Sequence, residues 1–192
     1  MVYQGPTGLS TISGPSGAGK TTLLGSILKR FPQAKPLLRV TTRLKRPTDN
    51  PNEYRYVSDA EFDALVQQQA FMWHMEIHGF RHGAPRAETT EALIRGHTVG
   101  DISYRSAEIL MHHAHLMERQ TCIRSAYLYI TDERELRRRL AARNELEVDR
   151  RIAECRSWNE AARRSFVPFE FIDARAPQEE VLQQALEFFQ QS

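Results

Sequence analysis

The 192-residue sequence contains only two cysteines and no long hydrophobic run. Cys122 and Cys155 do not have the spacing of a metal-ligand motif, which argues against a cysteine-held metal and against a disulfide-stabilised scaffold. No stretch approaches the ~18 apolar residues of a membrane span, and the first residues lack the basic segment and apolar run of a secretory signal. These absences predict a reduced, cytoplasmic protein.

Excess charge of one sign is also missing, since 26 Lys and Arg residues nearly balance 24 Asp and Glu residues and leave a net charge of +2. Bulk electrostatics therefore favour neither a nucleic acid nor a membrane as the partner. The arginines are nevertheless clustered, at residues 39–46 and 134–156. Clustered guanidinium groups in a nearly neutral chain indicate a small anionic ligand, although residues 134–139 could equally form a solvated helix face.

Predicted strands and helices alternate along most of the chain, the order that builds an α/β fold with a mostly parallel sheet covered on both faces. Short apolar segments predict strands at residues 8–13, 37–42, 97–102, 126–130 and 167–172. Apolar residues at helical spacing predict helices at residues 21–30, 88–95, 106–117, 131–143, 148–164 and 178–190.

The segment 40–84 departs from this alternation because its predicted strands are closely spaced. Two strands and a helix are predicted inside it, at residues 54–57, 70–77 and 60–69. Ser58 and Glu61 form a capping box at the start of that helix, and Gly79 and Gly83 are interpreted as turn residues. We therefore predict a small inserted substrate-binding subdomain at about 40–84, within a core made of residues 8–39 and 85–192.

A glycine-rich segment follows the first predicted strand and leads into the first predicted helix. Gly14-Pro15-Ser16-Gly17-Ala18-Gly19-Lys20-Thr21 matches G-x-x-x-x-G-K-[ST] at every position. Backbone N–H groups and the helix N-terminus can surround phosphate oxygens, Lys20 can reach the β- and γ-phosphates, and the Thr21 hydroxyl can ligate Mg²⁺. The motif predicts an ATP and Mg²⁺ site formed by Gly14, Ser16, Gly17, Ala18, Gly19, Lys20, Thr21 and Thr22.

Two further motifs lie farther along the chain, Thr41-Thr42-Arg43-Leu44-Lys45-Arg46-Pro47 and Glu53-Tyr54-Arg55-Tyr56-Val57-Ser58. Together with the glycine-rich loop they resemble the guanylate kinase family, whose members carry T-T-R-x-x-R-P and D-Y-x-F-V-S segments. The resemblance implies a single P-loop NTPase domain over residues 1–192, with an acceptor-binding subdomain and an arginine-rich helical lid at about 136–151. It also implies an enzyme that works as a monomer or a homodimer.

The resemblance assigns Arg43, Arg46 and Tyr54 to the phosphate of the acceptor, and two guanidinium forks suit a dianionic phosphate. It places His82 where the family has another phosphate-binding tyrosine, and it implies that Asp101 contacts both the metal and the acceptor. The lid arginines that would stabilise charge on the transferring phosphoryl group are Arg139, Arg143 and Arg151.

The positions that read guanine in the family are different in this chain. Trp73 replaces a glutamate, Arg39 a serine and Ala84 a hydroxyl residue. Glu76 could take the role of that glutamate only if the alignment shifts by three residues. Losing a charged partner for the base costs a few kcal/mol of discrimination, which is enough to change the substrate. Trp73 is then either a core residue or a stacking platform for the acceptor.

The sequence thus predicts ATP-dependent phosphoryl transfer to the phosphate of a small acceptor, with a nucleoside monophosphate such as GMP as the first choice. One alternative is a phosphosugar kinase resembling ribose 1,5-bisphosphate phosphokinase, which also lacks the glutamate and has a pair like Trp73-His74. Another is a non-catalytic guanylate-kinase-like interaction module. The complete P-loop and the lid arginines favour an enzyme, because such modules typically lose both.

Overall fold

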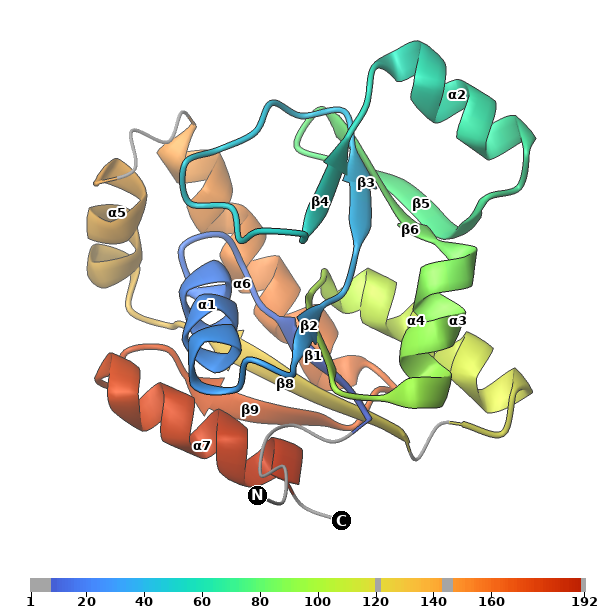
Figure 1. Ribbon diagram of the computed structural model, residues 1–192. Coiled ribbons are helices and arrows are strands. Elements are labelled where there is room, and N and C mark those ends of the chain that lie inside the picture. Colours follow the sequence, from blue (N-terminus) through green and yellow to red (C-terminus); the bar gives the residue numbers. More distant parts are fainter. Residues whose placement is uncertain (1–7, 120–121, 143–146, 191–192) are drawn as a thin grey trace.

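The computed structural model describes residues 8–119, 122–142 and 147–190 and contains two sheets (Figure 1). The larger sheet has the strand order β2-β7-β1-β8-β9, and all neighbouring strands in it are parallel. Its strands are β1 (Leu9–Ser13), β2 (Lys35–Pro36), β7 (Thr98–Asp101), β8 (Ile123–Tyr129) and β9 (Phe169–Asp173). The expected α/β fold with a P-loop core is confirmed.

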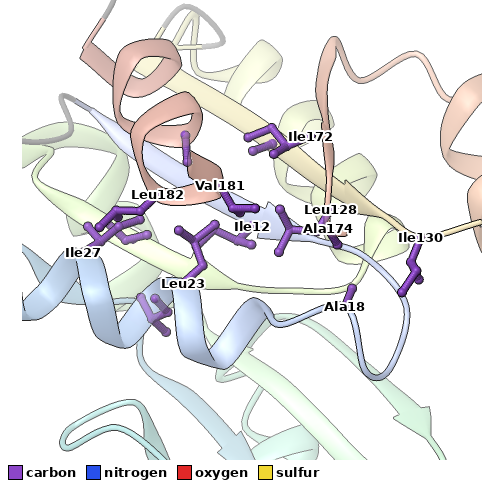
Figure 2. Close-up of a cluster of buried hydrophobic side chains, with 14 of the residues drawn as sticks. Ile12, Ala18, Leu23, Ile27, Leu128, Ile130, Ile172, Ala174, Val181 and Leu182 are labelled. Atoms are coloured by element: carbon purple, nitrogen blue, oxygen red, sulfur yellow. The ribbon is translucent and has the colours of Figure 1, made fainter. Parts of the chain in front are cut away.

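Two helices, α1 (Lys20–Arg30) and α7 (Gln178–Gln190), lie side by side on one face of the larger sheet. Figure 2 shows Leu23 and Ile27 of α1 and Val181 of α7 gathered over Ile12 and Leu128 of the strands. Each such side chain contributes roughly 1.5–3 kcal/mol when it is fully buried. This packing fixes α1, and with it the loop that precedes α1, on the end of β1.

The remaining core helices complete the larger sheet. α3 (Arg86–Arg95) and α4 (Tyr104–Leu116) share a second apolar cluster with Leu9 and Ile123 of the strands. α5 (Glu133–Ala141) places Leu136 and Leu140 in the cluster of α1 and α7. α6 (Val148–Arg164) runs past Tyr127 and contacts α4 through Trp158 and Tyr104. No helix in the described ranges is long and apolar enough to cross a membrane.

The smaller sheet has the order β4-β3-β6-β5 and lies above the carboxyl ends of the larger one (Figure 1). Its strands are β3 (Arg39–Thr41), β4 (Tyr54–Tyr56), β5 (Phe71–Ile77) and β6 (Phe80–Pro85). Helix α2 (Asp59–Gln67) begins at the expected capping box of Ser58 and Glu61, which is confirmed. Phe62 of α2 packs with Val40 and Phe71, so α2 covers one face of this sheet and leaves the other face toward the core.

Two predictions about the small sheet were wrong. Residues 37–42 do not form one strand: β2 ends at Pro36 on the larger sheet, Leu37 is buried, and β3 begins at Arg39 on the smaller sheet. Gly83 is not a turn residue but lies inside β6, where a Cβ would stand 2.6 Å from the ring of Phe71. The glycine therefore serves close packing within a strand, a role that its composition alone does not distinguish from a turn.

Candidate active site

The glycine-rich loop connects β1 to α1 and has the backbone that a phosphate cradle needs. Gly19 precedes α1 with φ of 97°, a left-handed conformation that suits glycine, and a Cβ at Gly14 would lie 2.4 Å from the Leu128 carbonyl oxygen. In the part of the chain that the structure describes, no side chain caps the N-terminus of α1. The first-turn N–H groups and the positive end of the helix dipole are thus placed to bind an anion.

The two polar side chains at the start of α1 have different partners. Lys20 Nζ donates to the Pro15 carbonyl oxygen at 3.1 Å, which folds the ammonium group back over the loop. The Thr21 hydroxyl donates to Asp101 Oδ2 at 3.2 Å. Asp101 ends β7, whose register places it beside Ile12 of β1. A hydroxyl and a carboxylate oxygen side by side are the hard oxygen ligands that Mg²⁺ prefers, so these residues fit the expected metal.

The loop between β3 and β4, residues 42–53, is organised around a carboxylate that was not predicted from the sequence. Asp49 accepts hydrogen bonds from both terminal nitrogens of Arg43 at 2.7 and 2.8 Å, from the Tyr56 hydroxyl at 2.6 Å, and from the Arg46 backbone N–H at 2.7 Å. Burial alone would raise the pKa of Asp49, but the hydrogen bonds from Arg43 and Tyr56 prevail and lower it to about 2. Asp49 therefore holds the Arg43 fork in a fixed orientation.

The ion pair of Arg39 and Glu53, which was also not predicted from the sequence, lies beside that of Arg43 and Asp49. Arg39 forms an ion pair with Glu53, whose side chain is almost completely buried. Glu53 also accepts from the side-chain amide of Asn50 at 3.0 Å. The guanidinium carbons of Arg39 and Arg43 lie 4.3 and 4.4 Å from the ring centre of Tyr54. Burial raises the pKa of Tyr54 to about 12, so its hydroxyl stays protonated and can donate to a phosphate.

Strand register decides which side chains of the small sheet face the core. Cross-strand partners share a face, and Trp73 pairs with Ala84, Met75 with His82, and Thr41 with His82. The face that carries these residues lies opposite the one covered by α2 and looks toward the P-loop. Met75 on this face accepts a weak hydrogen bond from the Ser103 hydroxyl at the start of α4. Of the positions that read the base in the family, Trp73 and Arg39 line the cleft together with His82, whereas Ala84 is fully buried and does not belong to the described lining.

Glu76 lies on the other face of the same sheet. It pairs with Arg81, which in turn bonds to Asp63 of α2 at 2.7 Å and stands over the ring of Phe62. The side chain of Glu76 is exposed. The alternative alignment that would make Glu76 the partner of guanine is therefore inconsistent with the strand register.

Trp73 is both a core residue and a wall of the site. Its side chain is only 7% exposed and belongs to an apolar cluster with Ala84 and Leu93. It also lines the cleft between the two sheets. His82 lines the same cleft, and its pKa is lowered to about 3 by burial and by the nearby charges of Arg39 and Arg43. His82 is therefore neutral at physiological pH.

The lid arginines do not all lie in one place. Arg151 lines the cleft from α6. Arg139 instead donates to Glu135 and to the Ala174 carbonyl oxygen, both at 2.8 Å, and does not belong to the described lining of the cleft. An ion pair one helical turn away and a carbonyl at the end of β9 hold it there. Arg143 lies outside the described residues.

The cleft has a volume of about 920 Å³ and joins both sets of phosphate-binding groups. Its lining includes Ser16, Gly17, Gly19, Lys20, Thr21 and Thr22 on one side, and Arg39, Arg43, Arg46, Tyr54 and His82 on the other. A separate hollow of about 580 Å³ is mainly apolar and lies between α4, β8 and Phe166, apart from every motif named above. The motifs therefore identify the larger cleft as the candidate active site.

This arrangement, with a P-loop on one wall of the cleft, is that of a P-loop phosphotransferase. The family described as Guanylate kinase matches residues 8–190. The chain belongs to the guanylate kinase family, and the expected relationship is confirmed.

Curated relatives and solved structures agree with this assignment. The guanylate kinase of Alkalilimnicola ehrlichii is 32% identical over 154 residues, which cover 78% of this chain and 73% of that protein. The guanylate kinase of Thermobifida fusca is 39% identical over 95 residues, a match that spans 49% of this chain and about half (48%) of that relative. A guanylate kinase structure from Anaplasma phagocytophilum shares the fold with a TM-score of 0.61 at 20% identity, covering 94% of this chain and 82% of that one.

Proposed function

We propose that this protein transfers the γ-phosphoryl group of ATP to the phosphate of a nucleoside monophosphate, giving the diphosphate, with GMP as the first acceptor to test. The observation that carries this proposal is the single cleft that has a P-loop on one wall and Arg43, Arg46 and Tyr54 on the other. Two phosphate-binding groups across one cleft can bring a donor and an acceptor phosphate into line, and positioning is the main source of catalysis in phosphoryl transfer.

On the donor side, the N-terminus of α1 and Lys20 hold the β- and γ-phosphates. Thr21 and Asp101 would hold Mg²⁺, which would supply positive charge to the phosphate oxygens. Lys20 must leave the Pro15 carbonyl to reach a phosphate, a change that needs only rotation of its side chain. Arg151 projects into the cleft from the proposed lid, residues 136–151, and supplies a cation for the charge that spreads over the equatorial oxygens.

On the acceptor side, the inserted subdomain at residues 40–84 holds the acceptor phosphate. Arg43 is pre-oriented by Asp49, Arg46 is exposed at the mouth of the cleft, and the Tyr54 hydroxyl is a donor. The nucleophile is a phosphate oxygen that is already ionised, so no general base is needed. Neutral His82 can donate one ring N–H to the phosphate without adding a fixed charge.

The base end of the acceptor site should discriminate weakly among bases. The face near Arg39 carries Trp73 and Ala84, and it offers no carboxylate at the strand position where the family reads guanine. Each guanine N–H group that is buried without an anionic partner reduces the binding free energy by about 1–3 kcal/mol. Asp101 can recover part of this loss, so we expect a reduced preference for GMP rather than its absence.

The test is a panel of acceptors assayed with purified protein, ATP and Mg²⁺. The values of kcat/KM for GMP, dGMP, AMP, CMP, UMP and ribose 1,5-bisphosphate would be compared under one set of conditions. Turnover of monophosphates within about 10²-fold of one another supports the proposal, whereas a 10³-fold advantage of GMP would refute the weak base discrimination. Turnover of ribose 1,5-bisphosphate alone would establish the phosphosugar alternative, and no turnover at all the non-catalytic one. Neither alternative is supported by the relatives described above.

A further inference from the structure

The hairpin between β5 and β6 turns through two residues with positive φ, His78 at 56° and Gly79 at 76°. Positive φ at both central positions is typical of the tight hairpin turn that favours Asn-Gly. Histidine at the first position tolerates this conformation less readily than glycine. A residue kept in a mildly strained position is a reason to ask what its side chain contacts.

The side chain of His78 contacts α6, the helix that carries Arg151. His78 Nδ1 lies 3.5 Å from Glu154 Oε2, and its ring stacks on Trp158 with 11° between the planes and 6.4 Å between the centres. Both His78 and Trp158 line the cleft. Within the described residues this contact joins the tip of the small sheet directly to α6, the helix that carries Arg151.

Glu154 is shared between the hairpin and the lid arginine. Arg151 NH1 lies 3.6 Å from the same carboxylate oxygen that faces His78, and Arg150 Nε donates to the other oxygen at 3.2 Å. The side chain of Arg151 is 11% exposed and that of Glu154 is 27% exposed, so this ion pair is only partly screened by water. One carboxylate group thus faces both His78 of the hairpin and the guanidinium of Arg151.

We propose that Glu154 is a positioning residue that couples the acceptor hairpin, through His78, to the placement of Arg151. This inference rests on the proposed function, because it assigns Arg151 to the transferring phosphoryl group. When the acceptor draws the small sheet toward the P-loop, the His78 contact holds Glu154, and Glu154 holds Arg151 toward the cleft. The residues at the tip of the hairpin then contribute to kcat although they bind neither phosphate.

Kinetics of Glu154→Gln, His78→Asn and the double variant test this coupling. Each single change should lower kcat about tenfold, leave the KM for ATP within about twofold, and leave Tm nearly unchanged. The double variant should be no slower than the slower single variant, since both changes break one connection. Matched controls are Glu160→Gln on α6 and His74→Asn on the other face of β5, and both should keep wild-type kcat. Fully additive losses, or a kcat unchanged in both single variants, would overturn the proposal.

A second measurement does not depend on turnover. Trp73 and Trp158 are the only tryptophans, so in a Trp73→Phe background all indole emission comes from Trp158. His78→Asn removes the stacked ring and should shift that emission, whereas His74→Asn should not. If the wild type phosphorylates no acceptor, the proposed function fails. In that case the emission spectrum tests only the contact between His78 and Trp158. A spectrum unchanged by His78→Asn would show that the contact is absent, and a shift confined to His78→Asn would support it.

Discussion

Replacement of Arg43 by alanine should separate the acceptor site from the donor site. Three of the five N–H donors of Arg43 bond to Leu44 and Asp49, and Arg43 also shares a side-chain hydrogen bond with Tyr54, so within the described residues one donor is left for the acceptor phosphate. A hydrogen bond to a charged group contributes about 1.5–3 kcal/mol. Losing one such bond should weaken acceptor binding about 10- to 150-fold, and ATP affinity should stay within about twofold.

The same change has a separate effect on stability. Asp49 is 5% exposed at its side chain and keeps only its bonds from Tyr56 and the Arg46 backbone when Arg43 is removed. Breaking one side of a buried ion pair destabilises by about 3–5 kcal/mol, so Tm should fall as well. Arg43→Lys keeps a cation beside Asp49 but loses the planar fork. Arg55→Ala, at the exposed position of β4, is the control that should leave both affinities unchanged. Separate calorimetric titrations of GMP and of a non-hydrolysable ATP analogue decide the matter. An equal loss for both ligands in Arg43→Lys would refute the assignment of Arg43 to the acceptor.

Three further outcomes follow from single side chains. Lys20→Ala should abolish phosphoryl transfer without lowering Tm, and transfer within about threefold of wild type in a coupled assay would contradict the donor site. The pKa of His82 is lowered to about 3, so between pH ~6.5 and ~3 the unfolded chain binds a proton that the folded chain does not. As the pH is lowered through this range, the free energy of unfolding should decrease by up to about 1.4 kcal/mol per pH unit. Urea unfolding at several pH values measures this slope, which should be smaller in His82→Gln. Gly25→Ala favours α1 by about 1 kcal/mol, so Tm should stay the same or rise. The added Cβ would lie 3.0 Å from Asn50 Oδ1 and would displace the residue that donates to Glu53, the partner of Arg39. Acceptor affinity should therefore fall, and an unchanged affinity would show that the position of Asn50 does not matter for acceptor binding.

The sequence predicts where the P-loop and the two arginines of the neighbouring loop lie because these features depend on short contiguous motifs. The P-loop fixes its own backbone through glycines, and T-T-R-x-x-R-P delivers two arginines from one loop. Asp49 and Glu53 are harder to recognise because a carboxylate near arginines in sequence has many possible partners. The signal was nevertheless present: arginines that must offer forks to a ligand need a carboxylate to orient them, and Asp49 lies six residues after Arg43.

Contacts that depend on register or on distant segments could not be read in this way. The choice between Trp73 and Glu76 depends on which face of β5 looks toward the P-loop. The register with β6 determines that face, and β6 was not predicted because Gly83 was interpreted as a turn residue. Arg139 and Arg151 look equivalent in sequence, since both lie on arginine-rich amphipathic helices. Only the folded chain shows that Arg139 is bound to Ala174, 35 residues away, while Arg151 lies in the cleft.

The two halves of the acceptor site place different demands on the substrate. Under the proposed function, the phosphate half has forked cations, a protonated phenol and an orienting carboxylate, and these would fix the reacting oxygen whatever group is attached to that phosphate. The base half presents the buried Trp73 and the paired Arg39, which hold the wall in shape but match no particular base edge. Under the proposed function, discrimination then comes from how well the whole acceptor lets the small sheet move toward the P-loop while His78 stays in contact with α6. The contact of His78 with Glu154 would transmit this movement to Arg151. An acceptor that fits poorly would leave Arg151 misplaced, so it should lower kcat more than it raises KM.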